Sequence, residues 1–137
     1  HSHSYTGNPI ACAVACETLN IFEDEDILEQ NKAKSALIKE KMEEYLLDIP
    51  YVGDLRHIGM IGAVEIVKDR ESKESFDWKE RVAYQIYKIA LQHGVLLRPV
   101  GNIIYFMPPY VISEDEIDFM IKTARTAIKE YFETRPK

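Results

Sequence analysis

The sequence predicts an α+β fold, in which a small and mostly antiparallel sheet packs with helices on one face. The chain has 137 residues, of which 46% are hydrophobic, and this is enough for one buried core. Its hydrophobic residues recur at helical spacing near both ends and alternate in the middle. The alternating segments come in adjacent pairs joined by short turns, which is typical of antiparallel strands. The predicted order is α-α-β-β-α-β-β-α.

The first helix is predicted to begin at Asn8-Pro9 and to end near Phe22. Asn is a preferred N-cap, and Pro is favoured at the first helical position. Residues 10–16 are apolar or small on every side, so we expect this helix to be buried on most faces. Something outside the chain would have to cover its outer face, which predicts a fragment or an obligate oligomer.

A second helix is predicted over residues 26–48, where Pro50 follows. Residues 52–67 then alternate between apolar and polar side chains and predict two strands that are broken at Gly59. The segment 68–77 is charged and predicts a loop.

A third helix is predicted over residues 78–92. Its apolar positions recur at helical spacing, which puts Trp78 on the inward face together with Val82 and Ile86. Gly94 follows directly and is the expected C-terminal cap.

The last part of the chain predicts a strand pair and a helix. Two strands are expected at 95–98 and 103–107, with a turn at 99–102 between them. Ser113 and Glu116 have the spacing of a capping box, which starts the final helix. An apolar stripe at helical spacing is predicted along this helix, formed by Ile117, Met120, Ile121, Ala124, Ala127, Ile128 and Tyr131.

Composition excludes several classes of partner. There are 17 Lys and Arg against 23 Asp and Glu, and the net charge of −6 argues against nucleic acids and anionic membranes. No stretch approaches the roughly 18 apolar residues of a membrane span. The two cysteines, Cys12 and Cys16, lie in a helical pattern that does not suit a disulfide. They predict small buried residues in a reduced compartment, hence a cytoplasmic protein, with a metal pair as the alternative.

The strongest candidate for ligand binding is the segment Ser4-Tyr5-Thr6-Gly7, directly before the first helix. It offers hydroxyl groups and a glycine next to a helix N-terminus, where free backbone N–H groups favour an anion such as phosphate. The alternative is an ordinary helix cap with a tight lead-in loop.

A second candidate is Arg98, at the end of an apolar strand. Its planar guanidinium suits bidentate capture of a carboxylate, although an ion pair with an acidic residue of the chain is the alternative. Tyr105 lies across the same predicted hairpin and could donate a hydrogen bond to a ligand, or simply pack.

The histidines predict less. His57 and His93 read as structural residues, the latter favourable in the last turn of a helix. His1 and His3 could form a metal pair or belong to a terminal tag, and we expect no metal site. No Ser/His/Asp order and no paired carboxylates stand out.

Three segments together resemble the C-terminal part of the class III aminotransferases, which depend on pyridoxal phosphate. They are His3-Ser4-Tyr5-Thr6-Gly7-Asn8-Pro9, then Gly59-Met60-Ile61-Gly62-Ala63-Val64-Glu65, and finally Leu97-Arg98-Pro99-Val100-Gly101-Asn102-Ile103-Ile104-Tyr105-Phe106-Met107-Pro108-Pro109-Tyr110. They span nearly the whole chain. The resemblance implies the small C-terminal domain of a fold type I enzyme. Residues 1–25 would then be the cofactor-phosphate loop and a buried helix from the missing large domain, and 26–137 the small domain.

The resemblance also implies roles for four residues. In that family a hydroxyl residue at the position of Ser4, with His3 beside it, binds the cofactor phosphate across a homodimer interface. The arginine that holds the substrate carboxylate falls on Arg98, and a substrate-side tyrosine falls on Tyr105. A glycine commonly precedes His3 in the family, whereas Ser2 stands here.

Within the class, the third segment is most similar to the aminotransferases of biotin synthesis. These carry an amino group from S-adenosylmethionine to 8-amino-7-oxononanoate and give 7,8-diaminononanoate. The alternatives are a class III enzyme acting on ornithine or 4-aminobutyrate, or a non-enzymatic α+β module that binds a ligand or partner. The lysine that forms the Schiff base in the family lies upstream of the Ser4 segment. We therefore expect no catalytic residue in this chain and no activity from it alone.

Overall fold

The computed structural model describes residue 3 and residues 6–135. Four α-helices, one short 3-10 helix and five strands occur in that part of the chain. Their bounds are α1 Pro9–Asp24, α2 Ile27–Leu46, β1 Val52–Ile58, β2 Ile61–Asp69, β3 Glu74–Ser75, η1 Trp78–Glu80, α3 Val82–Gln92, β4 Arg98–Val100, β5 Ile103–Phe106 and α4 Glu114–Thr134.

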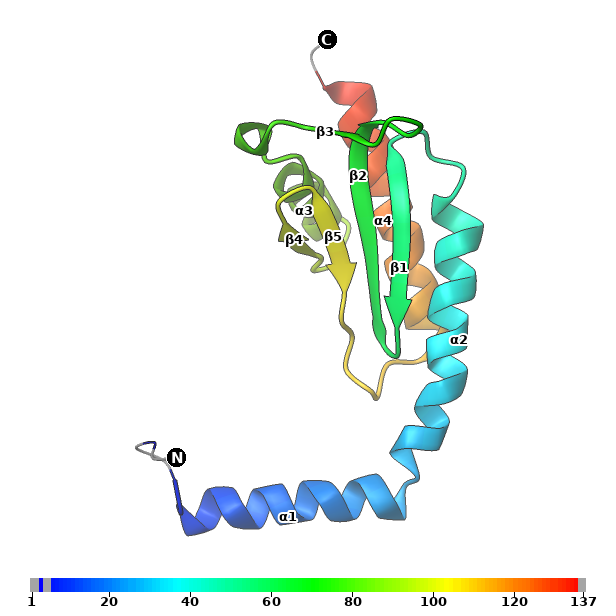
Figure 1. The fold of residues 1–137 in the computed structure, drawn as a ribbon. Helices are drawn as coiled ribbons and strands as arrows, with labels where there is room; N and C mark the ends of the chain where they lie inside the picture. The colour runs from blue at the N-terminus through cyan, green and yellow to red at the C-terminus, as the bar shows by residue number, and fades with distance from the viewer. Residues whose placement is uncertain (1–2, 4–5, 136–137) are drawn as a thin grey trace.

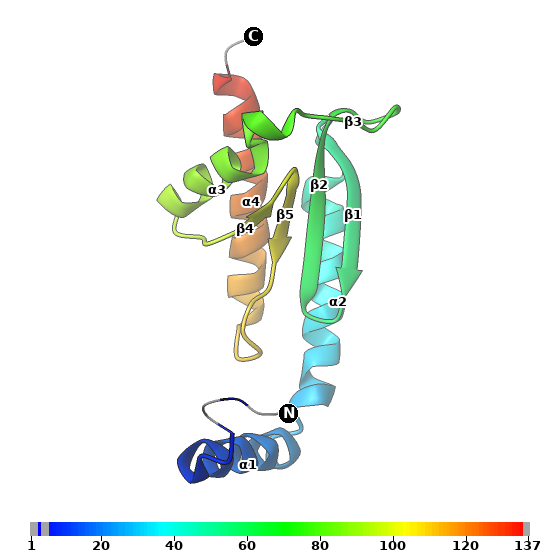
Figure 2. The same ribbon diagram turned by 60° about the vertical axis from the view of Figure 1, so that its left-hand side comes forward.

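The strands form one antiparallel sheet. The strand order is β1-β2-β5-β4, and the short β3 pairs with β2. Helices α2, α3 and α4 lie on one side of it, while α1 extends away from this body (Figures 1 and 2). The predicted α+β class with a small antiparallel sheet is therefore confirmed.

The core lies between the sheet and these three helices. Side chains alternate along β2, so Val64 and Ile66 are buried against the helices. The predicted stripe of the last helix is confirmed, and its capping box is complete because Ser113 and Glu116 bond each other's backbone N–H. The fully buried members of this stripe are Ile117, Ile121, Ala124, Ala127 and Ile128.

The predicted third helix is two separate elements. Arg81 has a φ of 50°, in the left-handed region, and it ends η1 before α3 begins. The helical phase is lost there, so Trp78 is 75% exposed instead of facing inward. Val82 and Ile86 are buried as predicted, and Gly94 follows the helix with a positive φ of 86°.

Two strand boundaries differ from the sequence expectation. The predicted loop 68–77 contains β3, which pairs with the end of β2. Strand β4 begins only at Arg98 and includes Pro99, so the turn narrows to Gly101-Asn102. Proline is tolerated here because β4 is an edge strand and needs no donor on its outer side.

Helix α1 is the main correction. It contains no buried residue, although Ile10 and Leu19 are large and apolar, with Ile10 76% exposed. Cys12 and Cys16 are free thiols, but they are exposed, so the prediction that they are buried is wrong for this chain. The apolar pattern predicts burial, whereas within residues 6–135 only Phe22 of this helix is even partly covered.

Two searches of the described residues give negative findings. None of their helices combines the length and apolar character that crossing a membrane requires. They also contain no group of three or more His, Cys, Asp or Glu side chains that could hold a metal ion.

Gly53 in β1 lies against a stiff buried neighbour. A Cβ atom built on Gly53 would stand 2.6 Å from Cγ1 and 2.9 Å from Cγ2 of Val67. Because valine has few side-chain conformations, it cannot turn away. We predict that Gly53→Ala lowers the free energy of unfolding by about 1–3 kcal/mol, measured by urea denaturation. In a Val67→Ala background, Gly53→Ala should lower the free energy of unfolding by less than about half as much. An equal loss of free energy in the two backgrounds would contradict the steric explanation.

An ion pair joins the end of α2 to α4. Arg125 donates from Nη2 to Oδ2 of Asp48 at 2.6 Å, and from Nη1 to Oδ1 of Asp48 and to the backbone carbonyl of Tyr45. This hydrogen bonding by Arg125 lowers the pKa of Asp48 from 3.8 to about 2. The charged form of Asp48 is therefore favoured by folding.

A depressed carboxyl pKa contributes stability above its ordinary value and loses it as the pH falls toward the folded value. We predict that the free energy of unfolding falls between pH 4 and pH 2, and that the fall is shallower in Asp48→Asn. The control is Glu133→Gln, which changes an exposed carboxyl group of α4, the helix that carries Arg125. Urea denaturation across this pH range measures both, and parallel curves for Asp48→Asn and the parent chain would refute the assignment.

Candidate functional site

Arg98 and Tyr105 face each other across the β4–β5 hairpin. They are paired in the antiparallel register, which places their side chains on the same face of the sheet. The Nε of Arg98 donates a hydrogen bond to the hydroxyl of Tyr105 at 3.0 Å. The guanidinium carbon also lies 5.6 Å from the centre of the tyrosine ring. The sequence-based pairing of these two residues is thus reproduced by the fold.

The pair projects from the face of the sheet that the helices leave open. Ile104 and Phe106, which flank Tyr105 in β5, are buried against the helices, so the alternating direction turns Tyr105 the other way. Arg98 is exposed, and no carboxylate of the described residues lies within 4.0 Å of it. The alternative of an internal ion pair is therefore wrong.

The hydrogen bond to Tyr105 uses only one of the five N–H donors of Arg98. It fixes the plane of the guanidinium and leaves both terminal nitrogens without a partner among the described residues. Two parallel terminal N–H groups match the two oxygens of a carboxylate. The geometry therefore suits end-on capture of an organic acid.

A hollow of about 610 Å³ includes Arg98 in its lining. Most of its other walls are apolar, among them Leu96, Met107, Pro109 and Phe119. Phe106, whose side chain faces the helices, and the acidic Glu116 of α4 line it as well, whereas Tyr105 does not, so this hollow is not a simple apolar extension of the Arg98–Tyr105 contact. No sequence pattern marks Leu96 or Phe119; their exposure, which only the fold reveals, is the signal for them.

The start of α1 differs from the predicted anion site. The side-chain oxygen of Asn8 accepts hydrogen bonds from the backbone N–H groups of Ile10 and Ala11, at 3.0 and 3.2 Å. The carbonyl of Asn8 accepts from the N–H of Cys12 at 2.9 Å. Asn8 thus satisfies the first turn, and the expectation of free N–H groups at this helix end is wrong. The helix cap itself is an ordinary one.

The loop before α1 is only partly described. The backbone N–H of His3 donates to Oγ1 of Thr6, and the N–H of Thr6 donates to the carbonyl of His3, both at 3.0 Å. Ser4, the predicted phosphate ligand, lies outside the described residues, as does His1. A phosphate held here would rely on the loop, because the helix end has no donor to spare. The start of α1 and the β4–β5 hairpin lie apart in space (Figures 1 and 2).

The remaining candidates have structural partners. His93 lies 2.9 Å from a carboxylate oxygen of Glu130, and His57 lies 3.4 Å from the hydroxyl of Ser35. Both therefore fit the structural interpretation.

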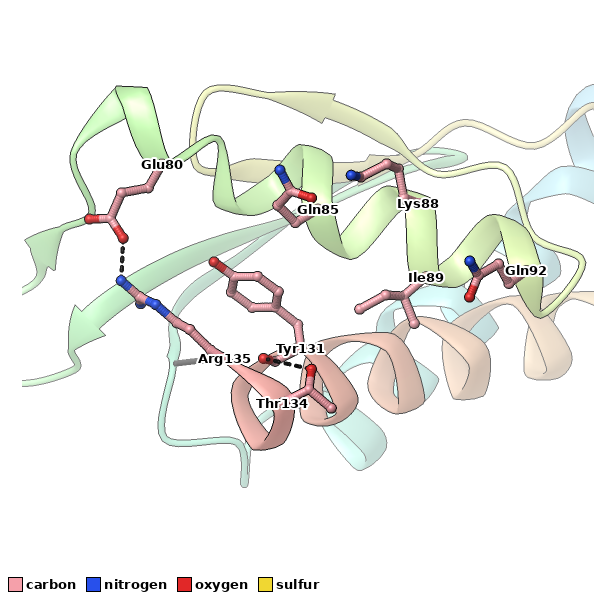
Figure 3. Close-up of a pocket in the computed structure, with 8 residues that line it drawn as sticks. All are labelled: Glu80, Gln85, Lys88, Ile89, Gln92, Tyr131, Thr134 and Arg135. Atoms are coloured by element: carbon pink, nitrogen blue, oxygen red, sulfur yellow. Dashed lines mark hydrogen bonds and ion pairs between the residues drawn. The ribbon is translucent and has the colours of Figure 1, made fainter. Parts of the chain in front are cut away.

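Figure 3 shows a second hollow, of about 510 Å³, between α3 and α4. Two of its polar side chains are already paired, because Arg135 donates to Glu80. Thr134 donates to the backbone carbonyl of Tyr131 in the same helix, and burial raises the pKa of Tyr131. The arginine of this hollow is therefore paired with a carboxylate, unlike Arg98, whose terminal nitrogens have no partner among the described residues.

The chain matches known protein families along most of its length. The family model described as "Aminotransferase class-III" matches residues 1–128. A curated adenosylmethionine-8-amino-7-oxononanoate aminotransferase of Geobacter sulfurreducens is 47% identical over 121 residues, which are 88% of this chain and 26% of that protein. A putrescine–pyruvate aminotransferase of Pseudomonas aeruginosa is 35% identical over 130 residues, 95% of this chain and 28% of that protein.

A solved structure gives the same result for the fold. The crystal structure of adenosylmethionine-8-amino-7-oxononanoate aminotransferase from Methanocaldococcus jannaschii superposes with a TM-score of 0.90 and 37% identity. The match covers 95% of this chain and 30% of that one. The chain thus spans less than a third of the length of these relatives.

The hydrogen bond between Arg98 and Tyr105 can be tested directly. We predict that Tyr105→Phe speeds solvent exchange of the Arg98 Nε proton several-fold, because the acceptor is lost while the ring stays. NMR of the arginine side chains measures this rate. Tyr84→Phe is the matched control, since Arg81 lies over the Tyr84 ring at 4.3 Å without bonding its hydroxyl. An unchanged Arg98 rate in Tyr105→Phe would show that the bond is absent in solution.

Proposed function

The chain belongs to the class-III aminotransferases, and we propose that it is the C-terminal part of a pyridoxal-phosphate-dependent enzyme of biotin synthesis. The whole protein would transfer an amino group from S-adenosylmethionine to 8-amino-7-oxononanoate. The single observation that carries this proposal is Arg98, oriented by Tyr105 and free of any internal acid among the described residues. The 47% identity to a relative of that name supports the choice of substrates.

In this proposal the chain binds and positions, and it does not itself perform the central chemistry. Pyridoxal phosphate, when bound, supplies an electron sink for removing a proton next to the amino group. The terminal nitrogens of Arg98 bind the carboxylate of the keto acid, and Tyr105 holds the guanidinium plane. Holding a substrate in one orientation can remove several kcal/mol from the barrier.

The cofactor contact of this chain is confined to its first residues. We propose that Ser4, with His3 beside it, holds the phosphate group. Two hydrogen bonds join His3 and Thr6, the described residues that stand on either side of Ser4 in the sequence. The remaining cofactor contacts, including the Schiff-base lysine, would come from the part of the relatives that this chain does not match.

A homodimer and a two-part organisation follow from the same proposal. The start of α1 lies apart from the hairpin of its own chain, so the residues before it would serve a site shared with a second copy (Figure 1). Residues 1–25 would connect to a large domain that covers α1, and 26–137 would form the small domain. The two free cysteines of α1 support a cytoplasmic location, where thiols stay reduced.

A second candidate is another class-III aminotransferase, acting on ornithine, 4-aminobutyrate or a related amine. The 35% identity to a putrescine–pyruvate aminotransferase is the observation in its favour. The amino donor separates the two candidates, because only the biotin-type enzyme uses S-adenosylmethionine. A non-enzymatic module would use neither donor.

The role of Arg98 predicts which half of the reaction suffers when it is changed. In the protein that contains this chain, Arg98→Ala should slow the half-reaction with 8-amino-7-oxononanoate about 100-fold, because two charge-assisted hydrogen bonds are lost. The half-reaction with S-adenosylmethionine should change less than about threefold. Single-turnover absorbance of the cofactor measures each half separately.

Arg56→Ala is the matched control, since this exposed arginine of β1 is paired with Glu65 on a neighbouring strand. It should leave both half-reactions unchanged. Equal losses in both halves for Arg98→Ala would remove Arg98 from its proposed role. Turnover of ornithine or 4-aminobutyrate without S-adenosylmethionine would favour the second candidate.

A further inference from the structure

Tyr110 lies at the meeting point of the two N-terminal helices and the segment that follows β5. Its ring packs edge-on against Phe22 of α1, with the ring centres 5.8 Å apart and an angle of 76° between the planes. Its backbone carbonyl accepts a hydrogen bond from Nζ of Lys34 in α2 at 2.6 Å. One residue thus contacts both sides of the corner between α1 and α2.

The direction of α1 depends on few other contacts. No residue of α1 is buried, and Phe22 is the one position of this helix that is even partly covered. The corner passes through Asp26, whose φ of 49° is left-handed and whose side chain caps nothing. The side chain of Gln30 donates to the carbonyl of Glu25 across it, and the backbone of Asp26 bonds residues of both helices. Within residues 6–135, the aromatic contact therefore restrains α1 where no buried interface does.

Tyr110 is also connected to the substrate hairpin by a stiff piece of chain. Strand β5 carries Tyr105 and ends at Phe106, and Pro108 and Pro109 lie between that end and Tyr110. Each proline fixes its own φ, so the segment has little freedom to absorb a displacement. The N–H of Ile112 bonds the carbonyl of Pro109 at 3.1 Å and closes a turn around Tyr110. A shift of α1 would thus be passed to β5.

We propose that Tyr110 is a positioning residue, which fixes α1 relative to the Arg98–Tyr105 pair. Its ring holds Phe22, its carbonyl holds Lys34, and the two prolines connect both contacts to β5. The consequence for turnover rests on the proposed function, because the loop and the hairpin would carry the phosphate and carboxylate contacts. The restraint on α1 is a property of the chain alone.

The restraint can be measured as a distance. Cys12→Ser leaves Cys16 as the single thiol of α1, and Lys129→Cys adds a thiol to α4. Pulsed electron paramagnetic resonance then measures the distance distribution between spin labels on these two residues, which reports the direction of α1. We expect Tyr110→Ala to broaden the distance distribution at least about twofold, and Tyr110→Phe to keep the parent width because the ring and carbonyl remain. Tyr84→Ala, a change to an exposed tyrosine of α3, is the control and should leave the width unchanged.

Phe22→Ala removes the other ring of the contact and should broaden the distance distribution as Tyr110→Ala does. The melting temperature of each variant checks that the sheet and helices α2, α3 and α4 remain folded. A distribution that stays narrow in both alanine variants would overturn the proposal. This result does not depend on any aminotransferase activity, so it is separate from a failure of the proposed function.

In the protein that contains this chain, the same variants have a kinetic readout. Tyr110→Ala should raise the KM for the keto acid about tenfold and change kcat less than about threefold, since a misplaced contact weakens binding. Tyr110→Phe should restore the parent KM. A KM that is unchanged in Tyr110→Ala would show that α1 and the hairpin are not coupled, even where the distance distribution broadens.

Discussion

The antiparallel pairing of β4 with β5 is the constraint on which the candidate site depends. It sets Arg98 opposite Tyr105, and the alternation of side chains sends both to the open face while Ile104 and Phe106 enter the core. A slip of one residue in this register would reverse the faces and bury the guanidinium. The buried neighbours thus determine the position of an exposed charge, and Gly101, with a φ of 58°, closes the turn that fixes the register.

Local signals in the sequence predicted much of this fold. The Asn8-Pro9 start, the Ser113–Glu116 capping box and the stripe of α4 depend on neighbours a few residues away, and all three are confirmed. The opposition of Arg98 and Tyr105 also follows from a short hairpin. These features need no knowledge of distant contacts, which is why a single sequence is enough to find them.

The failures share a cause as well, because each depends on something that local spacing does not encode. Trp78 has the right spacing for α3, but the left-handed backbone at Arg81 puts it out of phase. Strand β3 consists of polar residues and exists because the edge of β2 offers it hydrogen bonds. The sequence predicts N–H groups at the start of α1 that could bind an anion, whereas those of Ile10 and Ala11 donate to the side chain of Asn8. The apolar faces of α1 indicate burial without indicating by what.

The uncovered surface of α1 also has a practical consequence for handling the chain by itself. The apolar side chains of Ile10, Val14 and Leu19 are exposed to water. Two exposed thiols, Cys12 and Cys16, lie on the same helix. Such an exposed apolar helix favours self-association of the molecules. Oxidation by air then joins the associated molecules through intermolecular disulfides. A purified sample kept without a reductant will therefore age toward crosslinked aggregates, at a rate that rises with its concentration.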